Sequence, residues 1–277
     1  MFRRVSVWVL CVALAQLIAV SAYSAESDPA GYQPRMGQPG KDVVWIPSPP
    51  DMVEKMLDMA RVTPSDFVID LGSGDGRNVI AAAKRGARAM GVEYNPDMVE
   101  LAKRAAAAAA VGDRATFAQG DMFEADISKA TVLVLFLIPA NLEKLAPKFI
   151  NLPPGTRIVS NTYEIGGGWE PDATERVTLC ASWCGAHLYI VPAKVEGAWQ
   201  LEDATLRLEQ DFQNVYGTYV IDGVPVTIEN GRLQGNEITF KVAGMTYSGR
   251  VSGETMQGVA KGHTTKSWSA SRMREVP

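Results

Sequence analysis

Cysteine, histidine and excess positive charge are all scarce in this sequence. Three cysteines and two histidines in 277 residues leave few nitrogen and sulfur ligands, so no metal centre is predicted. Lysine and arginine total 27 against 31 aspartate and glutamate residues, which gives a formal net charge of −4. No broad basic field is therefore available to hold a phosphate backbone, and nucleic acid is not an expected partner.

An apolar run sets the first 25 residues apart from the rest of the chain. Arg3 and Arg4 precede the apolar stretch 5–20, and small residues follow it up to Ala25. This pattern is typical of a secretory signal peptide at 1–25 and predicts an exported protein, periplasmic or secreted. The run is shorter than the roughly 20 residues of a membrane-spanning helix. An uncleaved N-terminal anchor stays open as an alternative, and it would be the only membrane contact.

Two cysteines remain beyond the signal, Cys180 and Cys184. In an oxidising compartment, an even pair this close can form a disulfide. Alternatively, they are two small apolar side chains in a pair of strands. A metal site with His187 is a third interpretation, but it lacks a convincing fourth ligand.

The chain after the signal divides into three segments. Residues 26–44 are rich in glycine and proline and are predicted to form a flexible arm with little regular structure. Residues 45–194 alternate between strand-like and helix-like runs, which predicts a mostly parallel sheet of seven strands with crossover helices. The predicted strands are 67–71, 89–93, 115–119, 131–137, 157–162, 177–179 and 188–191, and the predicted helices are 51–61, 77–85, 96–110 and 141–149.

Residues 195–277 have a different sequence pattern. Short alternating segments are separated by turn dipeptides such as Asp222-Gly223 and Asn230-Gly231. They predict an antiparallel meander, either closed into a small barrel or left as a half barrel, since closure or curling protects the edges of a sheet. The predicted fold is therefore an α/β domain followed by a small antiparallel β domain.

The strongest local motif is VIDLGSGDG at 68–76, directly after a strand and before a helix. Its three glycines, Gly72, Gly74 and Gly76, allow a sharp turn and a close approach of the backbone to a ligand. The G-x-G-x-G spacing differs from the G-x-G-x-x-G of dinucleotide folds. Asp70 and Asp75 repel phosphate and favour a cation, so the sulfonium and amino groups of S-adenosylmethionine fit this loop.

Further acids follow the next two strands. Glu93 ends the second strand about 20 residues after the first glycine, where a carboxylate can accept hydrogen bonds from both ribose hydroxyls. Asp121 ends the third strand and can accept from the adenine amine, with Met122 or Phe123 packing on the ring. The predicted cofactor-binding residues are Asp70, Gly72, Ser73, Gly74, Asp75, Gly76, Glu93, Tyr94, Asp121 and Met122.

The stretch from Trp45 to about Pro171 resembles class I, Rossmann-like S-adenosylmethionine-dependent methyltransferases. It is most similar to the branch of lysine methyltransferases of the ATP synthase c subunit and their bacterial relatives. The resemblance implies one antiparallel strand in the sheet, and a lid formed by the segment 46–50. After the fifth strand the family usually has a histidine and an acid, whereas this chain has Ser160, Asn161, Thr162 and Tyr163. The segments that carry the resemblance are VWIPSPPDMVEKML, VIDLGSGDGRNVIAAAKRGARAMGVEYNPDMVELAKRAA, GDMFEADISKATVLVLFLIP and LPPGTRIVSNTYEIGGGWEPD.

The acceptor of the methyl group is less well defined by the sequence. The fourth strand ends in LFLIPAN, without the Asn/Asp-Pro-Pro-Tyr signature that holds planar amines, so its residues 136–139 are expected to line a dry acceptor channel. Tyr163 and Asn161 are predicted to orient the acceptor or take a proton, with Asn141 and Glu164 as further candidates. The predicted activity is methyl transfer to a protein lysine or a small molecule. The alternative is an exported, non-catalytic binding protein that keeps the fold. No oligomeric state is predicted.

Overall fold

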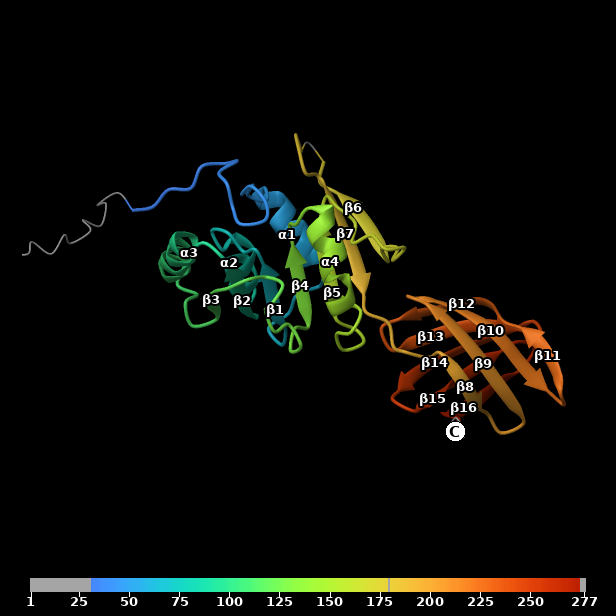
Figure 1. Cartoon of the computed structure of the whole chain (residues 1–277). Coiled ribbons are helices and arrows are strands. Elements are labelled where there is room, and N and C mark those ends of the chain that lie inside the picture. Colours follow the sequence, from blue (N-terminus) through green and yellow to red (C-terminus); the bar gives the residue numbers. More distant parts are fainter. Residues whose placement is uncertain (1–30, 179, 275–277) are drawn as a thin grey trace, which may run out of the picture. The chain divides into compact units, whose positions relative to one another are not determined.

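The computed structural model describes residues 31–178 and 180–274, which form two β-sheets (Figure 1). The first sheet has seven strands and is mostly parallel, and the second is antiparallel and closes on itself. Both parts of the predicted fold class are confirmed. The predicted signal peptide at 1–25 and the start of the arm lie outside the described residues. Within the described part of the chain, no helix is long and apolar enough to cross a membrane.

The first sheet has the strand order β3-β2-β1-β4-β5-β7-β6. Strand β7 runs antiparallel to both β5 and β6, and the other neighbouring pairs are parallel. The single antiparallel strand implied by the resemblance is therefore present. Its elements are α1 Pro50–Met59, β1 Phe67–Leu71, α2 Arg77–Lys84, β2 Arg88–Glu93, α3 Pro96–Ala108, β3 Ala115–Gln119, β4 Val132–Leu135, α4 Pro139–Phe149, β5 Arg157–Asn161, β6 Ala173–Arg176 and β7 Gly185–Ile190.

Both faces of this sheet are covered, because alternate residues of a strand point to opposite sides. In β1, Val68 packs into a cluster with α1, α2 and α3, whereas Ile69 and Leu71 pack with α4. The β4 strand repeats the pattern, with Val132 on the first side and Leu133 on the second. The helices thus cover the faces, and the loops after the carboxyl ends of the strands are left to form a ligand site.

Local sequence determines where the helices begin. Pro50, Pro96 and Pro139 each occupy the first turn of a helix, where a missing N–H costs nothing. Asn95 caps α3, because its side chain accepts a hydrogen bond from the backbone N–H of Asp97 at 2.9 Å. Helices α3 and α4 begin within a few residues of the ends of β2 and β4, which keeps the loops around the site short.

A strand was predicted at 177–179, but Val177 and Thr178 are not in a strand, and residue 179 lies outside the described residues. The strand β6 lies earlier, at Ala173–Arg176, and all four of its residues are exposed. An exposed edge strand has no buried face and so no apolar alternation to detect. Val177 instead belongs to the turn, where its backbone N–H donates to the carbonyl oxygen of Cys184.

A disulfide joins Cys180 to Cys184 in the turn between β6 and β7. Of the three interpretations left open by the sequence, the structure therefore has the first. The bond closes a loop of five residues immediately before β7, the strand that pairs with β5.

The second sheet is a closed barrel of eight strands. Its neighbours in order are β9, β10, β12, β13, β14, β15, β16 and β8, and β8 pairs back to β9, while β11 is attached to β10 alone. Trp199, Phe240 and Trp268 fill its interior. Its strands are β8 Gly197–Gln200, β9 Ala204–Asp211, β10 Asn214–Ile221, β11 Val224–Thr227, β12 Glu229–Gln234, β13 Glu237–Val242, β14 Met245–Ser252, β15 Thr255–Lys261 and β16 Thr265–Arg272.

Candidate functional site

The loop between β1 and α2 is built on three glycines with positive φ. Gly72, Gly74 and Gly76 have φ angles of 73°, 53° and 80°, a region that other residues rarely adopt. The backbone N–H groups of Gly72 and Ser73 both donate to the carbonyl oxygen of Val92, at 2.8 and 3.1 Å. The loop is thereby fixed to the end of β2, and the N–H of Gly74 donates to Glu93.

Asp70, at the end of β1, is buried with 2% of its surface exposed. The side-chain amide of Asn78 donates to its Oδ2 at 3.0 Å. Burial raises the pKa of the Asp70 carboxyl well above its ordinary value, and the neighbouring charges of Glu93 and Asp75 raise it further. A cation beside Asp70 would favour the ionised form.

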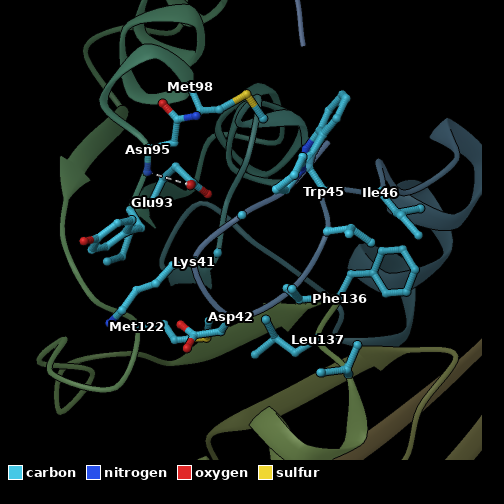
Figure 2. A pocket seen from close by; sticks show the side chains of 18 of the residues that line it. Lys41, Asp42, Trp45, Ile46, Glu93, Asn95, Met98, Met122, Phe136 and Leu137 are labelled. Carbon is cyan, nitrogen blue, oxygen red and sulfur yellow. Dashed lines mark hydrogen bonds between the residues drawn. The ribbon is translucent and has the colours of Figure 1, made fainter. Parts of the chain in front are cut away.

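Glu93, at the end of β2, is oriented by two backbone amides. Its Oε2 accepts from the N–H of Gly74 and its Oε1 from the N–H of Asn95, each at 2.9 Å. A carboxylate has about four acceptor positions, so two remain for the hydroxyls of a ligand. Figure 2 shows Glu93 and Asn95 together on one side of the cavity.

Asp121 follows β3 and forms an ion pair with Lys41 from the arm. The distance from Lys41 Nζ to Asp121 Oδ2 is 2.5 Å, and the Lys41 ammonium lies 5.0 Å from the centre of the Tyr94 ring. The Lys41 hydrogen bond holds the pKa of the Asp121 carboxyl below its usual value. Tyr94, Asp121 and Met122, all predicted to contact the cofactor, line the same cavity.

The arm forms the roof of this cavity (Figure 2). Residues 38–46 line it, and two backbone hydrogen bonds close their turn, from Gly37 to Trp45 and from Trp45 to Gln38. The Trp45 ring lies directly over the glycine loop. A Cβ atom added at Gly74 would lie 2.5 Å from Trp45 Nε1, so the ring and the loop are in close contact. Residues 31–49 have no helix or strand, and residues 38–46 are folded onto the site.

A second, smaller cavity adjoins the first and is lined by polar groups. Two buried atoms there, Ser73 Oγ and Asn78 Oδ1, have no hydrogen-bond partner among the described residues. Asp75 also lines this cavity, but both its carboxylate oxygens accept from the guanidinium of Arg77. Gly76 lines neither cavity, since it caps α2 and packs against Phe117.

The side of the main cavity beyond the ends of β4 and β5 is largely apolar and aromatic. Tyr163 lines it. Trp183, from the disulfide loop, lies edge to face with Phe136 at 6.0 Å between ring centres. The residues on this side are Phe136, Leu137, Ile138, Tyr163 and Trp183.

The other predicted acceptor residues lie elsewhere. Asn161 is fully buried and lines neither cavity, and its side-chain amide donates to Ser48 Oγ at 3.2 Å. It therefore ties β5 to the segment before α1, and a direct acceptor contact is not supported. Asn141 is buried at the start of α4, and Glu164 is exposed near His187. Neither lines the main cavity.

The residues present fit S-adenosylmethionine. Three carboxylates, Asp70, Glu93 and Asp121, lie at or just after the carboxyl ends of three neighbouring strands. They match a cationic ligand with sugar hydroxyls and an amine. The unpartnered Ser73 and Asn78 oxygens offer acceptors for the amino-acid end of the ligand. The described residues hold no group of three or more histidine, cysteine, aspartate or glutamate side chains that could bind a metal ion.

The comparisons with known proteins agree with this site. A family model described as the ANTKMT methyltransferase domain matches residues 70–173. A protein-lysine N-methyltransferase of Saccharolobus islandicus (strain REY15A) is 42% identical over 138 residues, covering 49% of this chain and 85% of the relative. The adenine nucleotide translocase lysine N-methyltransferase of Mus musculus is 34% identical, covering 54% of this chain and 71% of the relative.

A solved structure supports the same assignment. It is described as an RNA methyltransferase from Salinibacter ruber in complex with S-adenosyl-L-homocysteine, and it is 41% identical with a TM-score of 0.51. The match covers 54% of this chain and 96% of that one. Fold, acids and relatives together define a methyltransferase that uses S-adenosylmethionine. Within that class, the chain belongs to the family of the ANTKMT methyltransferase domain and the protein-lysine N-methyltransferases.

Sequence reasoning missed the contributions of the arm and of the disulfide loop. Lys41 and Trp183 come from segments without regular secondary structure, so no periodicity marks them. Asn78 carries a clearer signal, because it stands in the first turn of the helix that follows the glycine loop, where ligand-facing groups concentrate. Asn95 was detectable as a helix cap, which is also how it reaches Glu93.

Cofactor affinity is expected to fall as the pH is lowered from neutrality towards the ordinary pKa of an aspartate. The free protein holds Asp70 with a raised pKa because of burial, whereas a bound cation favours the carboxylate. Binding at low pH must then release a proton, and affinity falls as pH falls through the raised pKa. Calorimetric titration of S-adenosylmethionine from about pH 8 down to about pH 5 measures this. The Asp70→Asn variant should bind more weakly at neutral pH and show a flatter profile, and an unchanged slope would contradict this role of Asp70.

Removing the Lys41 side chain is expected to tighten cofactor binding a few-fold at low salt. The roofed cavity has a volume of about 160 Å³, below the roughly 300–1,000 Å³ typical of ligand sites, and Lys41 holds Asp121 in an ion pair. The pair is exposed, so the gain should be small and should shrink at high salt. Titration of Lys41→Ala is compared with Lys103→Ala, whose lysine pairs with Glu100 on the surface of α3. Weaker binding by Lys41→Ala alone would show that Lys41 supports the ligand instead.

Proposed function

We propose that this protein transfers the methyl group of S-adenosylmethionine to the ε-amino group of a lysine in another protein. The observation that carries the proposal is the aromatic and apolar part of the cavity wall, formed by Phe136, Tyr163 and Trp183. The activities named for the protein-lysine and adenine nucleotide translocase relatives support the same acceptor class.

A lysine side chain fits such a wall in two ways. Its four-carbon stem can lie against apolar side chains while its charged end reaches the interior of the site. The aromatic faces of Phe136 and Trp183 attract the ammonium group as it arrives. The planar bases and amides that other methyltransferases hold with an Asn/Asp-Pro-Pro-Tyr loop find no such loop here, since β4 is followed by residues 136–141, FLIPAN.

The chemistry requires a neutral amine. When bound, the cofactor supplies an electrophilic methyl carbon whose bond to the cationic sulfur breaks as the nitrogen lone pair forms the new bond. The free lysine ammonium has a pKa of about 10.4. The aromatic faces favour the cation at the entrance, whereas the loss of surrounding water deeper in the site disfavours the charged form and promotes release of a proton to solvent. The Tyr163 hydroxyl is available to accept a hydrogen bond from the amine and align its lone pair. No covalent bond between substrate and enzyme is needed.

Methyl incorporation tests the proposal. The full chain is incubated with S-adenosylmethionine labelled with tritium in the methyl group and with total bacterial protein, and separately with total RNA and a small-molecule extract. The expected label is in methylated lysine after acid hydrolysis of the protein fraction. Tyr163→Phe should slow the incorporation while leaving S-adenosylhomocysteine affinity unchanged. Label confined to RNA or to small molecules would contradict a lysine acceptor.

RNA is the main competing acceptor, because the similar protein from Salinibacter ruber is described as an RNA methyltransferase. The net charge of −4 argues against it, since RNA binding relies on basic surfaces. None of the comparisons supports the other alternative, a non-catalytic binding protein.

We also propose that the protein acts after export, on proteins of the cell envelope. The basic and apolar start of the sequence and the Cys180–Cys184 disulfide support an oxidising compartment. The cofactor is made in the cytoplasm, so export requires a supply of it outside. Fractionation of cells that express the full chain tests the location, with recovery in the periplasm expected and recovery in the cytoplasm contradicting it.

A further inference from the structure

The disulfide loop has a feature that the methyltransferase fold alone does not require. It places a tryptophan, Trp183, on the acceptor side of the cofactor cavity, edge to face with Phe136. Trp183 is only partly buried, so it is not a core residue of the sheet. Phe136 follows β4 and Trp183 precedes β7, so the contact joins two elements that do not pair with each other in the sheet.

The backbone at Trp183 needs support from its surroundings. Its φ angle is +58°, in the left-handed region that a bulky residue rarely adopts. The loop is closed on one side by the Cys180–Cys184 bond and on the other by the hydrogen bond from Val177 N–H to the Cys184 carbonyl oxygen. These two closures, together with the Phe136 contact, hold a conformation that a free loop would leave.

The loop is also fixed to the strand that leads to Tyr163. Directly after Cys184, the carbonyl oxygen of Gly185 accepts a hydrogen bond from Thr162 N–H at 2.7 Å, and Ala186 pairs with Asn161. The two aromatic residues Tyr163 and Trp183 therefore reach the cavity from neighbouring, paired strands. A change at the disulfide acts on the acceptor wall, while the glycine loop and Glu93 are held by other contacts, chiefly to β2 and α3.

We propose that Trp183, held by the Cys180–Cys184 disulfide, forms the outer wall of the methyl-acceptor site, so that acceptor binding depends on the oxidation state of this disulfide. This rests on the proposed function for the identity of the acceptor as a lysine. Reduction adds two electrons and two protons, for example from dithiothreitol, which closes to its own cyclic disulfide as Cys180 and Cys184 become thiols. Trp183 then loses its tether, and the acceptor loses one aromatic face.

The first measurement is hydrogen–deuterium exchange of the full chain saturated with S-adenosylhomocysteine, with and without dithiothreitol. Faster exchange is expected on reduction in peptides covering 180–185 and 136–138. Peptides covering 70–77 should not change, and S-adenosylhomocysteine affinity should stay within about twofold. The double variant Cys180→Ser, Cys184→Ser should behave as the reduced protein. Unchanged exchange at 136–138 would overturn the proposal.

The second measurement uses Nα-acetyl-lysine methylamide as the acceptor probe, titrated against the same complex by NMR. Its affinity is expected to fall roughly tenfold on reduction and in Trp183→Ala, given the usual strength of cation and aromatic contacts. Trp183→Phe should restore most of it. The control is Tyr216→Ala, which truncates an exposed aromatic residue of the barrel. Equal affinity in the oxidised and reduced protein would overturn the proposal.

The two measurements separate this proposal from the lysine assignment. If the probe does not bind the oxidised wild type but exchange at 136–138 still responds to reduction, the tethered wall is supported and the lysine acceptor is wrong. If the probe binds but neither reduction nor Trp183→Ala weakens it, the lysine acceptor is supported and the tethered wall is wrong.

Discussion

Replacing Glu93 by alanine is expected to weaken S-adenosylmethionine binding by roughly 100-fold, because hydrogen bonds to a charged group contribute about 1.5–3 kcal/mol each. Two effects add. The ribose hydroxyls lose their predicted acceptor, and the backbone amides of Gly74 and Asn95 lose the carboxylate that now orients them. The loop then has an ordering cost on binding that the wild type does not have. Calorimetric titration of the full-length variant with S-adenosylmethionine and S-adenosylhomocysteine measures the change.

The matched control is Glu100→Ala. Glu100 is an exposed glutamate on α3 that pairs with Lys103, so its removal changes the net charge equally without touching the cavity. It should bind the cofactor as the wild type does. Glu93→Gln keeps the shape but loses the charge, and an intermediate affinity is expected. Glu93 and Glu100 variants with the same affinity would contradict the ribose role of Glu93.

Replacing Phe240 by alanine is expected to destabilise the barrel by about 3–5 kcal/mol, the usual cost of truncating a buried phenylalanine. Phe240 is 1% exposed, stacks on Tyr247 at 4.8 Å between ring centres and meets Trp268 edge to face. Its loss would open a void at the centre of the aromatic core. Thermal unfolding followed by near-ultraviolet circular dichroism should show that the barrel of the variant unfolds at a lower temperature.

Cofactor affinity below that transition should not change, because every residue that lines the two cofactor cavities lies between 38 and 183. Tyr216→Ala provides the control, since that tyrosine is 54% exposed on β10, and its removal should change stability by at most about 0.5 kcal/mol. A barrel that melts unchanged in Phe240→Ala would contradict the core assigned here. A parallel loss of cofactor binding would show that the barrel supports the cofactor site.

Short runs bounded by turn residues were the most predictable strands. The predictions for β1 and β3 match the observed Phe67–Leu71 and Ala115–Gln119. Strand β1 is central and buried, whereas β3 is an edge strand in which only Ala115 and Phe117 are buried. The predicted fourth strand was too long, since residues 136 and 137 remain apolar but leave the sheet to line the cavity. Apolar character alone does not distinguish a strand residue from a ligand wall.

The closure of the barrel could not be predicted from the sequence. The predicted turn at Asp222-Gly223 does join β10 to β11. The predicted turn at Asn230-Gly231 is wrong, because both residues lie inside β12, where Gly231 pairs with Val215 and the register with β13 shifts. The ring closes where β16 pairs with β8, through Ser271 opposite Gln200 and Arg272 opposite Trp199. Those two strands lie far apart in the sequence, and nothing local in either one specifies the partner.

The acidic residues of the cofactor site were predictable from the sequence, whereas the contribution of residues 38–46 to the cavity was not. Asp70, Glu93 and Asp121 could be located because each lies at or just after the carboxyl end of a strand, and these ends of neighbouring parallel strands meet at one edge of a sheet. Lys41 lies in the glycine- and proline-rich arm and Trp45 directly follows it, and the composition of this region indicates only a lack of regular structure. Their contacts depend on the tertiary fold, through the Asp121 carboxylate and the Gly74 backbone.

The most direct test is a crystal structure of the full chain with S-adenosylhomocysteine. We expect ribose hydroxyls on the Glu93 carboxylate, the adenine amine on Asp121 with Lys41 displaced from it, and the amino-acid end beside Asp70, Ser73 and Asn78. A ligand bound elsewhere, or bound here with the Lys41–Asp121 pair intact and Glu93 without a ribose contact, would contradict the assignment of this cavity to the cofactor.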